Sequence, residues 1–180
     1  MEITLRKGGL EARVDTMGGE LVSLQNGADE YIWNGDPAYW SGRNPVLFPI
    51  VGALRDGTVR IGQRVCRMAR HGFARRREFS VAAQGPDFVE FCLREDPETL
   101  EQYPFAFLLN VRHTLTDEGF ETSFCVENPG GEAMPFCIGG HTAFRCPIRP
   151  GASFEDYRLV FEREEDAWAL LPGADGCLNP

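Results

Sequence analysis

The sequence predicts an all-β protein, a sandwich or barrel of short antiparallel strands, and three observations support this. Apolar and polar residues alternate with a period of two along much of the 180-residue chain, which is the pattern of half-buried strands. Turn-forming residues recur about every ten residues, and helical signal is sparse. No repeat, low-complexity tract or linker divides the chain, so a single domain is expected over residues 1–180.

The first half of the chain supplies short strands and one hairpin. Alternating segments at 78–84 and 88–94 flank Gly85-Pro86-Asp87, which favours a turn, so the two segments are expected to pair antiparallel. Similar short runs predict strands at 3–6, 10–14, 20–25 and 58–61.

The second half begins with the one predicted helix, Pro97–Gln102, which starts at a proline and ends before Tyr103-Pro104. A second hairpin follows, because residues 105–116 and 120–127 both alternate and a short polar link joins them. His113 falls on the apolar face of this hairpin, which predicts a core histidine with a satisfied hydrogen bond. Further strands are expected at 133–138 and 157–162. Nothing after them resembles a closing strand, so the sandwich is expected to be incomplete.

Composition and charge argue against several classes of function. The formal net charge of −9 disfavours nucleic acid as a partner, because phosphate contacts need a basic surface. No apolar stretch is long enough to cross a bilayer and the N-terminal segment is strand-like, so we expect a cytoplasmic protein with no membrane partner. Six scattered cysteines without a CxxC pair predict buried free thiols rather than disulfides or a zinc site.

Eight arginines lie close together between residues 55 and 77, whereas residues 155–166 are acidic. The arginines can form a solvated strand face. Alternatively, one or two of them can bind an anionic ligand such as a sugar phosphate through bidentate hydrogen bonds. The sequence leaves both interpretations open.

Three segments interrupt the strand pattern with residues that have no evident packing purpose. In residues 40–52 two prolines bracket an apolar run and force an irregular path. Residues 70–75 place a histidine beside a glycine between strands. In residues 138–144 two glycines precede His141, where they allow the backbone to approach a ligand closely.

Taken together, these segments resemble the aldose 1-epimerase superfamily, and more particularly its LacX-like branch. The resemblance spans residues 10 to 150, and its elements follow the family's order. Its main motifs are Gly18-Gly19-Glu20-Leu21, Tyr31-Ile32-Trp33, Asn44-Pro45-Val46-Leu47-Phe48-Pro49, His71-Gly72-Phe73-Ala74-Arg75, Tyr103-Pro104-Phe105 and Gly139-Gly140-His141.

The resemblance implies an antiparallel β-supersandwich of the galactose mutarotase-like kind, with a sugar site in a cleft. It also implies interconversion of the α and β anomers of an aldose, with no cofactor and no metal. In this reaction an acid and a base act on two oxygens of one sugar, so that the ring opens and recloses. A histidine suits the acid role because its unperturbed pKa is about 6.5.

The family's roles carry over to five positions, of which two are catalytic. His141 resembles the general acid at the ring oxygen, and His71 resembles the second histidine, which hydrogen-bonds sugar hydroxyls. Arg43 and Asn44 stand where the family places a polar contact to the substrate. An aromatic residue, Phe73 or alternatively Trp40, would stack on the apolar face of the sugar.

One departure from the family concerns the general base. In the family this base is a glutamate, which lies beyond the equivalent of Pro180, and the acidic residues 162–166 do not resemble its motif. Losing an acid–base partner costs about 100- to 10,000-fold in rate, so the chain by itself is expected to be a poor mutarotase. Three functions stay open: a mutarotase-like enzyme for a hexose or hexose phosphate, a non-catalytic carbohydrate-binding module, and a truncated remnant whose open sheet edges a homodimer covers.

Overall fold

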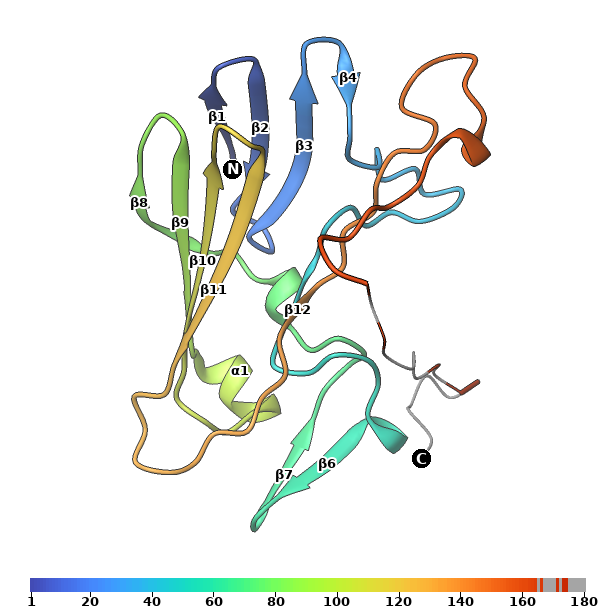
Figure 1. The fold of residues 1–180 in the computed structure, drawn as a ribbon. Helices are drawn as coiled ribbons and strands as arrows, with labels where there is room; N and C mark the ends of the chain where they lie inside the picture. The colour runs from blue at the N-terminus through green and yellow to red at the C-terminus, as the bar shows by residue number, and fades with distance from the viewer. Residues whose placement is uncertain (165, 167–170, 172, 175–180) are drawn as a thin grey trace.

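A computed structural model of the chain describes residues 1–164, 166, 171, 173 and 174, and two antiparallel four-stranded sheets dominate it (Figure 1). The first sheet has the order β1-β2-β3-β4, with β1 (Glu2–Lys7), β2 (Leu10–Asp15), β3 (Glu20–Asn26) and β4 (Asp29–Glu30). The second has the order β11-β10-β9-β8, with β8 (Ser80–Gln84), β9 (Phe88–Arg94), β10 (Leu108–Leu115) and β11 (Phe120–Glu127). The prediction of an all-β antiparallel protein is therefore confirmed.

Shorter elements connect the two sheets. One antiparallel pair joins β5 (Val46–Leu47) to β12 (Gly139–Gly140), and a second joins β6 (Thr58–Ile61) to β7 (Arg64–Arg67). The helix α1 (Pro97–Gln102) has the predicted bounds, and the Asp96 carboxylate caps it by accepting a hydrogen bond from the Thr99 amide. Single 3₁₀ turns occupy Arg55–Gly57, Ala74–Arg76 and Phe154–Asp156.

The hydrophobic core lies where the two sheets meet, since β10 contacts both β1 and β2. Along β10 every second residue is buried, as the alternation predicts. His113 is one of them, with 1% of its surface exposed. Its Nε2 donates to the Gly19 carbonyl at 2.9 Å, and its Nδ1 lies 3.0 Å from the Thr122 hydroxyl. His113 is thus a satisfied core histidine that ties the second sheet to the turn before β3.

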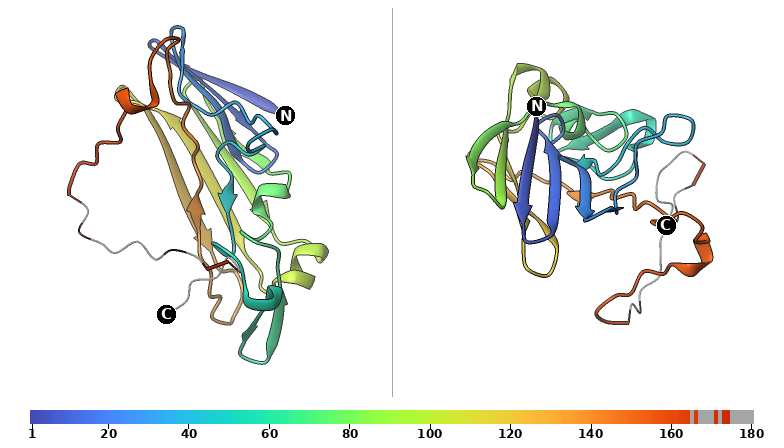
Figure 2. Two further views of the ribbon diagram at one scale, coloured as in Figure 1. Left: turned by 90° about the vertical axis from the view of Figure 1, so that its right-hand side faces the viewer. Right: turned by 90° about the horizontal axis from the view of Figure 1, so that it is seen from above.

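Two predicted strands are wrong. Residues 133–138 are irregular, because Pro135 has no amide to donate to a ladder, and the segment makes one backbone pairing before β12, from the Cys137 amide to the Pro49 carbonyl. Residues 157–162 follow the 3₁₀ turn at Phe154–Asp156 without forming a strand, and Figure 2 shows the segment after that turn running away from the sheets. Leu159 and Val160 there are 70% and 82% exposed, so alternation alone produced no strand where the described residues offer no partner.

The cysteines are free as predicted, within the described residues, but most of them are not buried. Cys66 is buried, and burial raises the pKa of its thiol. Cys92 and Cys146 are half-buried, whereas Cys125 and Cys137 are exposed, because strand alternation places Cys125 on the outer face of β11. Cys177 lies outside the described residues. In the part of the chain that is described, no helix has the length and apolar character that a membrane span requires.

Candidate functional site

A polar cavity of about 230 Å³ forms where three irregular segments converge beside β5 and β12. One segment precedes β5, the second leads into the 3₁₀ turn at Ala74–Arg76, and the third follows β12. The cavity is lined by Trp40, Pro45, Arg70, His71, Arg75 and His141. The two histidines predicted to act together, far apart in the sequence, therefore line the same cavity.

A short antiparallel ladder positions His141. Gly139 pairs with Leu47 and Gly140 with Val46, and the His141 amide extends this register by donating to the Pro45 carbonyl at 3.2 Å. The imidazole ring of His141 then projects from the end of the ladder and is exposed to solvent. Its centroid lies 5.9 Å from that of His71, with the two rings inclined at 70°.

His71 is fixed by a reciprocal contact with Gly52. The His71 amide donates to the Gly52 carbonyl at 2.8 Å, and the Gly52 amide donates to Nδ1 of the His71 ring at 3.0 Å. Because Nδ1 accepts a hydrogen bond, the neutral ring carries its proton on Nε2. Burial lowers the pKa of His71, and the nearby charges of Arg70, Arg75 and His141 lower it further. His71 is thus a neutral imidazole whose Nε2–H is a hydrogen-bond donor.

The backbone around His71 is held in an unusual conformation. His71 and Gly72 both have φ of +68°, in the left-handed region. A Cβ atom on Gly72 would lie 2.2 Å from the Phe48 carbonyl oxygen, so only glycine fits there. The same carbonyl accepts hydrogen bonds from the amides of Phe73 and Ala74, at 3.0 and 3.2 Å. Phe48 therefore anchors the segment that carries His71.

Trp40 forms the aromatic wall of the cavity. Its ring lies 4.9 Å from the ring of His141, inclined at 42°. The Trp40 carbonyl accepts a hydrogen bond of 2.7 Å from the indole of Trp33, and the Trp40 amide donates to the Asp36 carbonyl. These contacts fix the backbone of Trp40 beside the cavity.

Phe73 does not lie where its predicted role requires. Its side chain is 4% exposed and packs against Phe48 and Phe107, and it is not among the residues that line the cavity. The HGFAR motif turns through a 3₁₀ helix after Phe73, which directs this side chain into the core while His71 faces the cavity. Trp40, the alternative, is the aromatic residue in contact with the cavity.

Arg43 and Asn44 support the cavity from behind rather than lining it. The Asn44 side chain is buried, and its Oδ1 accepts a hydrogen bond of 2.6 Å from the hydroxyl of Thr142, the residue after His141. Arg43 donates from Nη2 to the Asn34 carbonyl at 3.1 Å, and its buried Nε has no hydrogen-bond partner among the described residues. In this structure Arg43 bridges two loops.

The charge of the cavity is positive. Arg70 and Arg75 line it together with the two histidines, and its six lining residues include no carboxylate. Arg75 donates from Nη2 to the Arg70 carbonyl at 3.0 Å, while its buried Nε has no partner among the described residues. Burial and the neighbouring guanidinium groups of Arg76 and Arg70 lower the pKa of Arg75. A cavity with this lining favours an anionic or oxygen-rich ligand.

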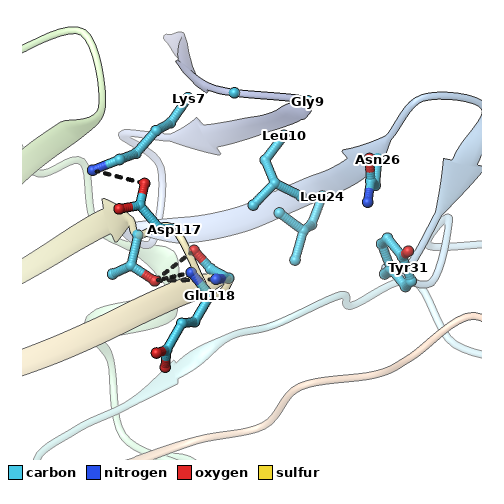
Figure 3. Close-up of a pocket in the computed structure, with 11 residues that line it drawn as sticks. Lys7, Gly9, Leu10, Leu24, Asn26, Tyr31, Asp117 and Glu118 are labelled. Carbon is cyan, nitrogen blue, oxygen red and sulfur yellow. Dashed lines mark hydrogen bonds and ion pairs between the residues drawn. The ribbon is translucent and has the colours of Figure 1, made fainter.

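A second cavity, of about 450 Å³, lies at the far ends of the sheets (Figure 3). It is lined by the β1–β2 turn, parts of β3 and the β10–β11 turn, and it contains no histidine. Lys7 forms ion pairs with Asp87 and Asp117, and the Thr116 hydroxyl accepts hydrogen bonds from the Glu118 and Gly119 amides. Because these groups already have partners, the second cavity shows no group that is placed to bind or react with a ligand.

Within the described residues, no cluster of three or more His, Cys, Asp or Glu residues is arranged to hold a metal ion. Pattern reasoning pointed to the arginine-rich region as a whole, but not to Arg70 and Arg75 as the two that reach the cavity. It also overlooked Glu20, whose carboxylate hydrogen-bonds the segment before β5. The signal for Glu20 was available, because the residue belongs to the Gly-Gly-Glu-Leu motif.

Comparisons with known proteins agree on one family. The model of the aldose 1-epimerase family matches residues 1–169. Among curated proteins, the plasmid-encoded LacX protein of Lactococcus lactis subsp. lactis is 38% identical over 172 residues, which cover 92% of this chain and 58% of that protein. The chromosomal LacX protein of the same organism matches equally well. The chain therefore spans less than two thirds of the length of these relatives.

Solved structures show the same fold. A galactose mutarotase related enzyme from Lactobacillus acidophilus superimposes with a TM-score of 0.83 at 32% identity, covering 87% of this chain and 53% of that one. A galactose mutarotase-like protein from Lactobacillus casei superimposes with a TM-score of 0.78 at 36% identity, covering 80% and 50%. The galactose mutarotase-like β-sandwich expected from the sequence is thereby confirmed as the fold of this chain.

Proposed function

Since this chain belongs to the aldose 1-epimerase family and to its LacX-like branch, we propose that its histidine cavity binds a hexose or hexose phosphate and interconverts the α and β anomers. The observation that carries the proposal is the meeting of His71 and His141, with ring centroids 5.9 Å apart, in one cavity. A mutarotase must hold an acid and a base on two oxygens of the same sugar, and this spacing suits two contacts to one ring.

The two imidazoles have different roles in this proposal. His71 is neutral and presents its Nε2–H, so it donates a hydrogen bond to a sugar oxygen and stabilises negative charge that develops there. His141 is exposed just after β12 and gives a proton to the ring oxygen as the C1–O5 bond breaks and the anomeric hydroxyl gives up its proton to a base. Trp40, beside the His141 ring, is the surface on which the apolar face of the sugar would stack.

Two arginines favour the phosphorylated form of the substrate. Arg70 and Arg75 line the cavity, and none of the six lining residues is a carboxylate. The buried Nε of Arg75 has no hydrogen-bond partner among the described residues. Two guanidinium groups that line one cavity offer the charged hydrogen bonds that phosphate oxygens accept. We therefore propose that a phosphate attached to the sugar lies against Arg75.

A non-catalytic carbohydrate-binding module is the second candidate, and the lining of the cavity favours it. Ring opening also requires a base at the anomeric hydroxyl, and none of the six lining residues is a carboxylate. In this proposal the described residues bind the sugar and include the acid, while the base of the family reaction is not among the six residues that line the cavity. Accelerated anomer exchange and binding without exchange distinguish the two functions.

The experiment follows anomer exchange by polarimetry or NMR after the protein is added to freshly dissolved α-D-glucose, α-D-galactose or a hexose 6-phosphate. Accelerated exchange that His141→Ala abolishes supports the enzyme. Saturable binding without acceleration supports the module, and neither exchange nor binding refutes both. Arg75→Ala is expected to weaken hexose phosphate about tenfold or more, from the loss of a charged hydrogen bond. Arg76→Ala is the matched control, because Arg76 is exposed and does not line the cavity.

Two further proposals concern the setting of the protein. The free thiols among the described cysteines support a cytoplasmic location, where thiols stay reduced. Within the described residues β8 and β11 are the edge strands of the second sheet, so we propose that a second copy pairs there. A protein paired in this way would sediment as a dimer, and a folded monomer would refute the pairing.

A further inference from the structure

One carboxylate outside the cavity holds the segment on which the cavity is built. Glu20, the first residue of β3, accepts two backbone hydrogen bonds on the same oxygen, Oε1. They come from the amide of Arg43 at 3.0 Å and the amide of Asn44 at 2.5 Å. Two hydrogen bonds to a charged acceptor are stronger than ordinary neutral ones, so this contact fixes the local path of the chain.

The opposite edge of the same segment forms the ladder that carries His141. The Arg43 carbonyl accepts from the Ala143 amide at 2.8 Å, and the Pro45 carbonyl accepts from the His141 amide at 3.2 Å. The same register places Thr142 opposite Asn44, and their side chains are hydrogen-bonded at 2.6 Å. The segment 43–45 is therefore held between Glu20 on one side and the strand bearing His141 on the other.

We propose that Glu20 is a positioning residue for the histidine cavity, acting through the backbone of Arg43 and Asn44. Its carboxylate accepts the hydrogen bonds of two amides, those of Arg43 and Asn44, that would otherwise need a partner strand. In this way Glu20 sets the distance between the ring of His141 and the rings of Trp40 and His71. That this geometry matters for binding a sugar rests on the proposed function. That Glu20 controls the positions of the rings does not depend on the proposed function.

Glu30 provides a matched control within the same sheet. Its Oε1 also accepts two backbone hydrogen bonds, from the amides of Leu24 and Ile32 at 3.0 and 2.9 Å. Glu30 does not line the cavity, and its two donors lie in β3 and just after β4 rather than in the segment before β5. Removing either carboxylate frees two backbone donors, so both alanine variants are expected to lose stability, but Glu20→Ala is expected to alter the cavity more, because its donors belong to the segment paired with His141 itself.

The experiment compares wild type, Glu20→Ala, Glu20→Gln and Glu30→Ala by three measurements. These are stability in urea, the NMR signals of the His71 and His141 rings without sugar, and the affinity for α-D-galactose. Glu20→Ala is expected to shift the His141 ring signals and to weaken binding about tenfold or more, since small misplacements of a site are costly. Glu20→Gln keeps an oxygen acceptor and is expected to restore both properties. Glu30→Ala is expected to lower stability while shifting the His141 ring signals less than Glu20→Ala does.

Ring signals that Glu20→Ala leaves unchanged, or that Glu30→Ala shifts to the same extent, would overturn the proposal and leave Glu20 a structural residue. If Glu20→Ala does not fold, Glu20→Asp replaces it, because its shorter side chain cannot reach both amides. If wild type binds no sugar, the proposed function fails, while the ring signals still decide the role of Glu20.

Discussion

The core and the cavity of this protein place the imidazole side chain in different environments, as His113 and the pair His71–His141 show. His113 lies between the sheets, 1% exposed, with both ring nitrogens in contact with a protein oxygen. His141 follows the two-residue strand β12 and is an exposed residue, and His71 accepts one hydrogen bond at Nδ1 while its Nε2 has no hydrogen bond among the described residues. The core satisfies its histidine completely, whereas the cavity leaves hydrogen-bonding capacity unused, and unused capacity is what a ligand can take up.

The largest expected effect tests whether the irregular cavity region is as tightly packed as the core. In Gly72→Ala the new Cβ would lie 2.2 Å from the Phe48 carbonyl oxygen, at a residue with φ of +68°. Left-handed strain and the backbone clash together are expected to cost about 3–5 kcal/mol in the free energy of unfolding, or to prevent folding. Gly62→Ala is the control, because Gly62 has φ of +61° and nothing within 4 Å, so strain alone costs about 1 kcal/mol. Equal losses in the two variants would show that the His71 segment is not anchored on Phe48.

The next effect separates the two kinds of histidine by pH. Burial lowers the pKa of His113 to about 4, although the hydrogen bond to Gly19 opposes this, while an unfolded histidine has a pKa of about 6.5. Between these values the unfolded chain binds a proton that the folded chain does not. Stability therefore falls as pH decreases from about 6.5 to about 4, by about 3 kcal/mol in total, and this contribution levels off below.

Urea unfolding at pH 7.5, 5.5 and 4.5 measures this slope. His113→Gln is expected to be less stable at neutral pH but to lose most of the pH dependence between 6.5 and 4. His141→Gln, which changes a histidine exposed to solvent, is expected to keep it. A slope that survives in His113→Gln would assign the pH dependence to another group.

The regular strands could be predicted because each depends on its own sequence pattern. β6, β9, β11 and α1 have the predicted bounds, and the alternation in β10 placed His113 correctly in the core. The predictions of strands at 133–138 and 157–162 were wrong, because an alternating pattern shows which side chains could share a buried face but does not provide a neighbouring strand to pair with.

The cavity could not be predicted from local pattern, because contacts between distant residues define it. Asn44 hydrogen-bonds Thr142 across 98 positions and Glu20 across 24. The family resemblance pointed to both histidines, and the structure brings their rings together. It did not reveal that Phe73, two residues after His71, faces the core, since the direction of a side chain depends on the 3₁₀ turn that follows.

The smallest expected effect is the one that sharpens the comparison most. His141→Ala removes the side chain of an exposed residue whose ring neighbours are Trp40 and His71, so the free energy of unfolding should change by no more than about 0.5 kcal/mol. His113→Ala, which empties a buried position and leaves the Gly19 carbonyl without its donor, is expected to cost about 2–4 kcal/mol by the same urea measurement. Should His141→Ala destabilise the fold as much as His113→Ala, the His141 ring would be part of the packing of the protein. A histidine that is needed for stability gives no reason to infer a ligand. A histidine that is not needed for stability, and that lies beside a second histidine, gives such a reason.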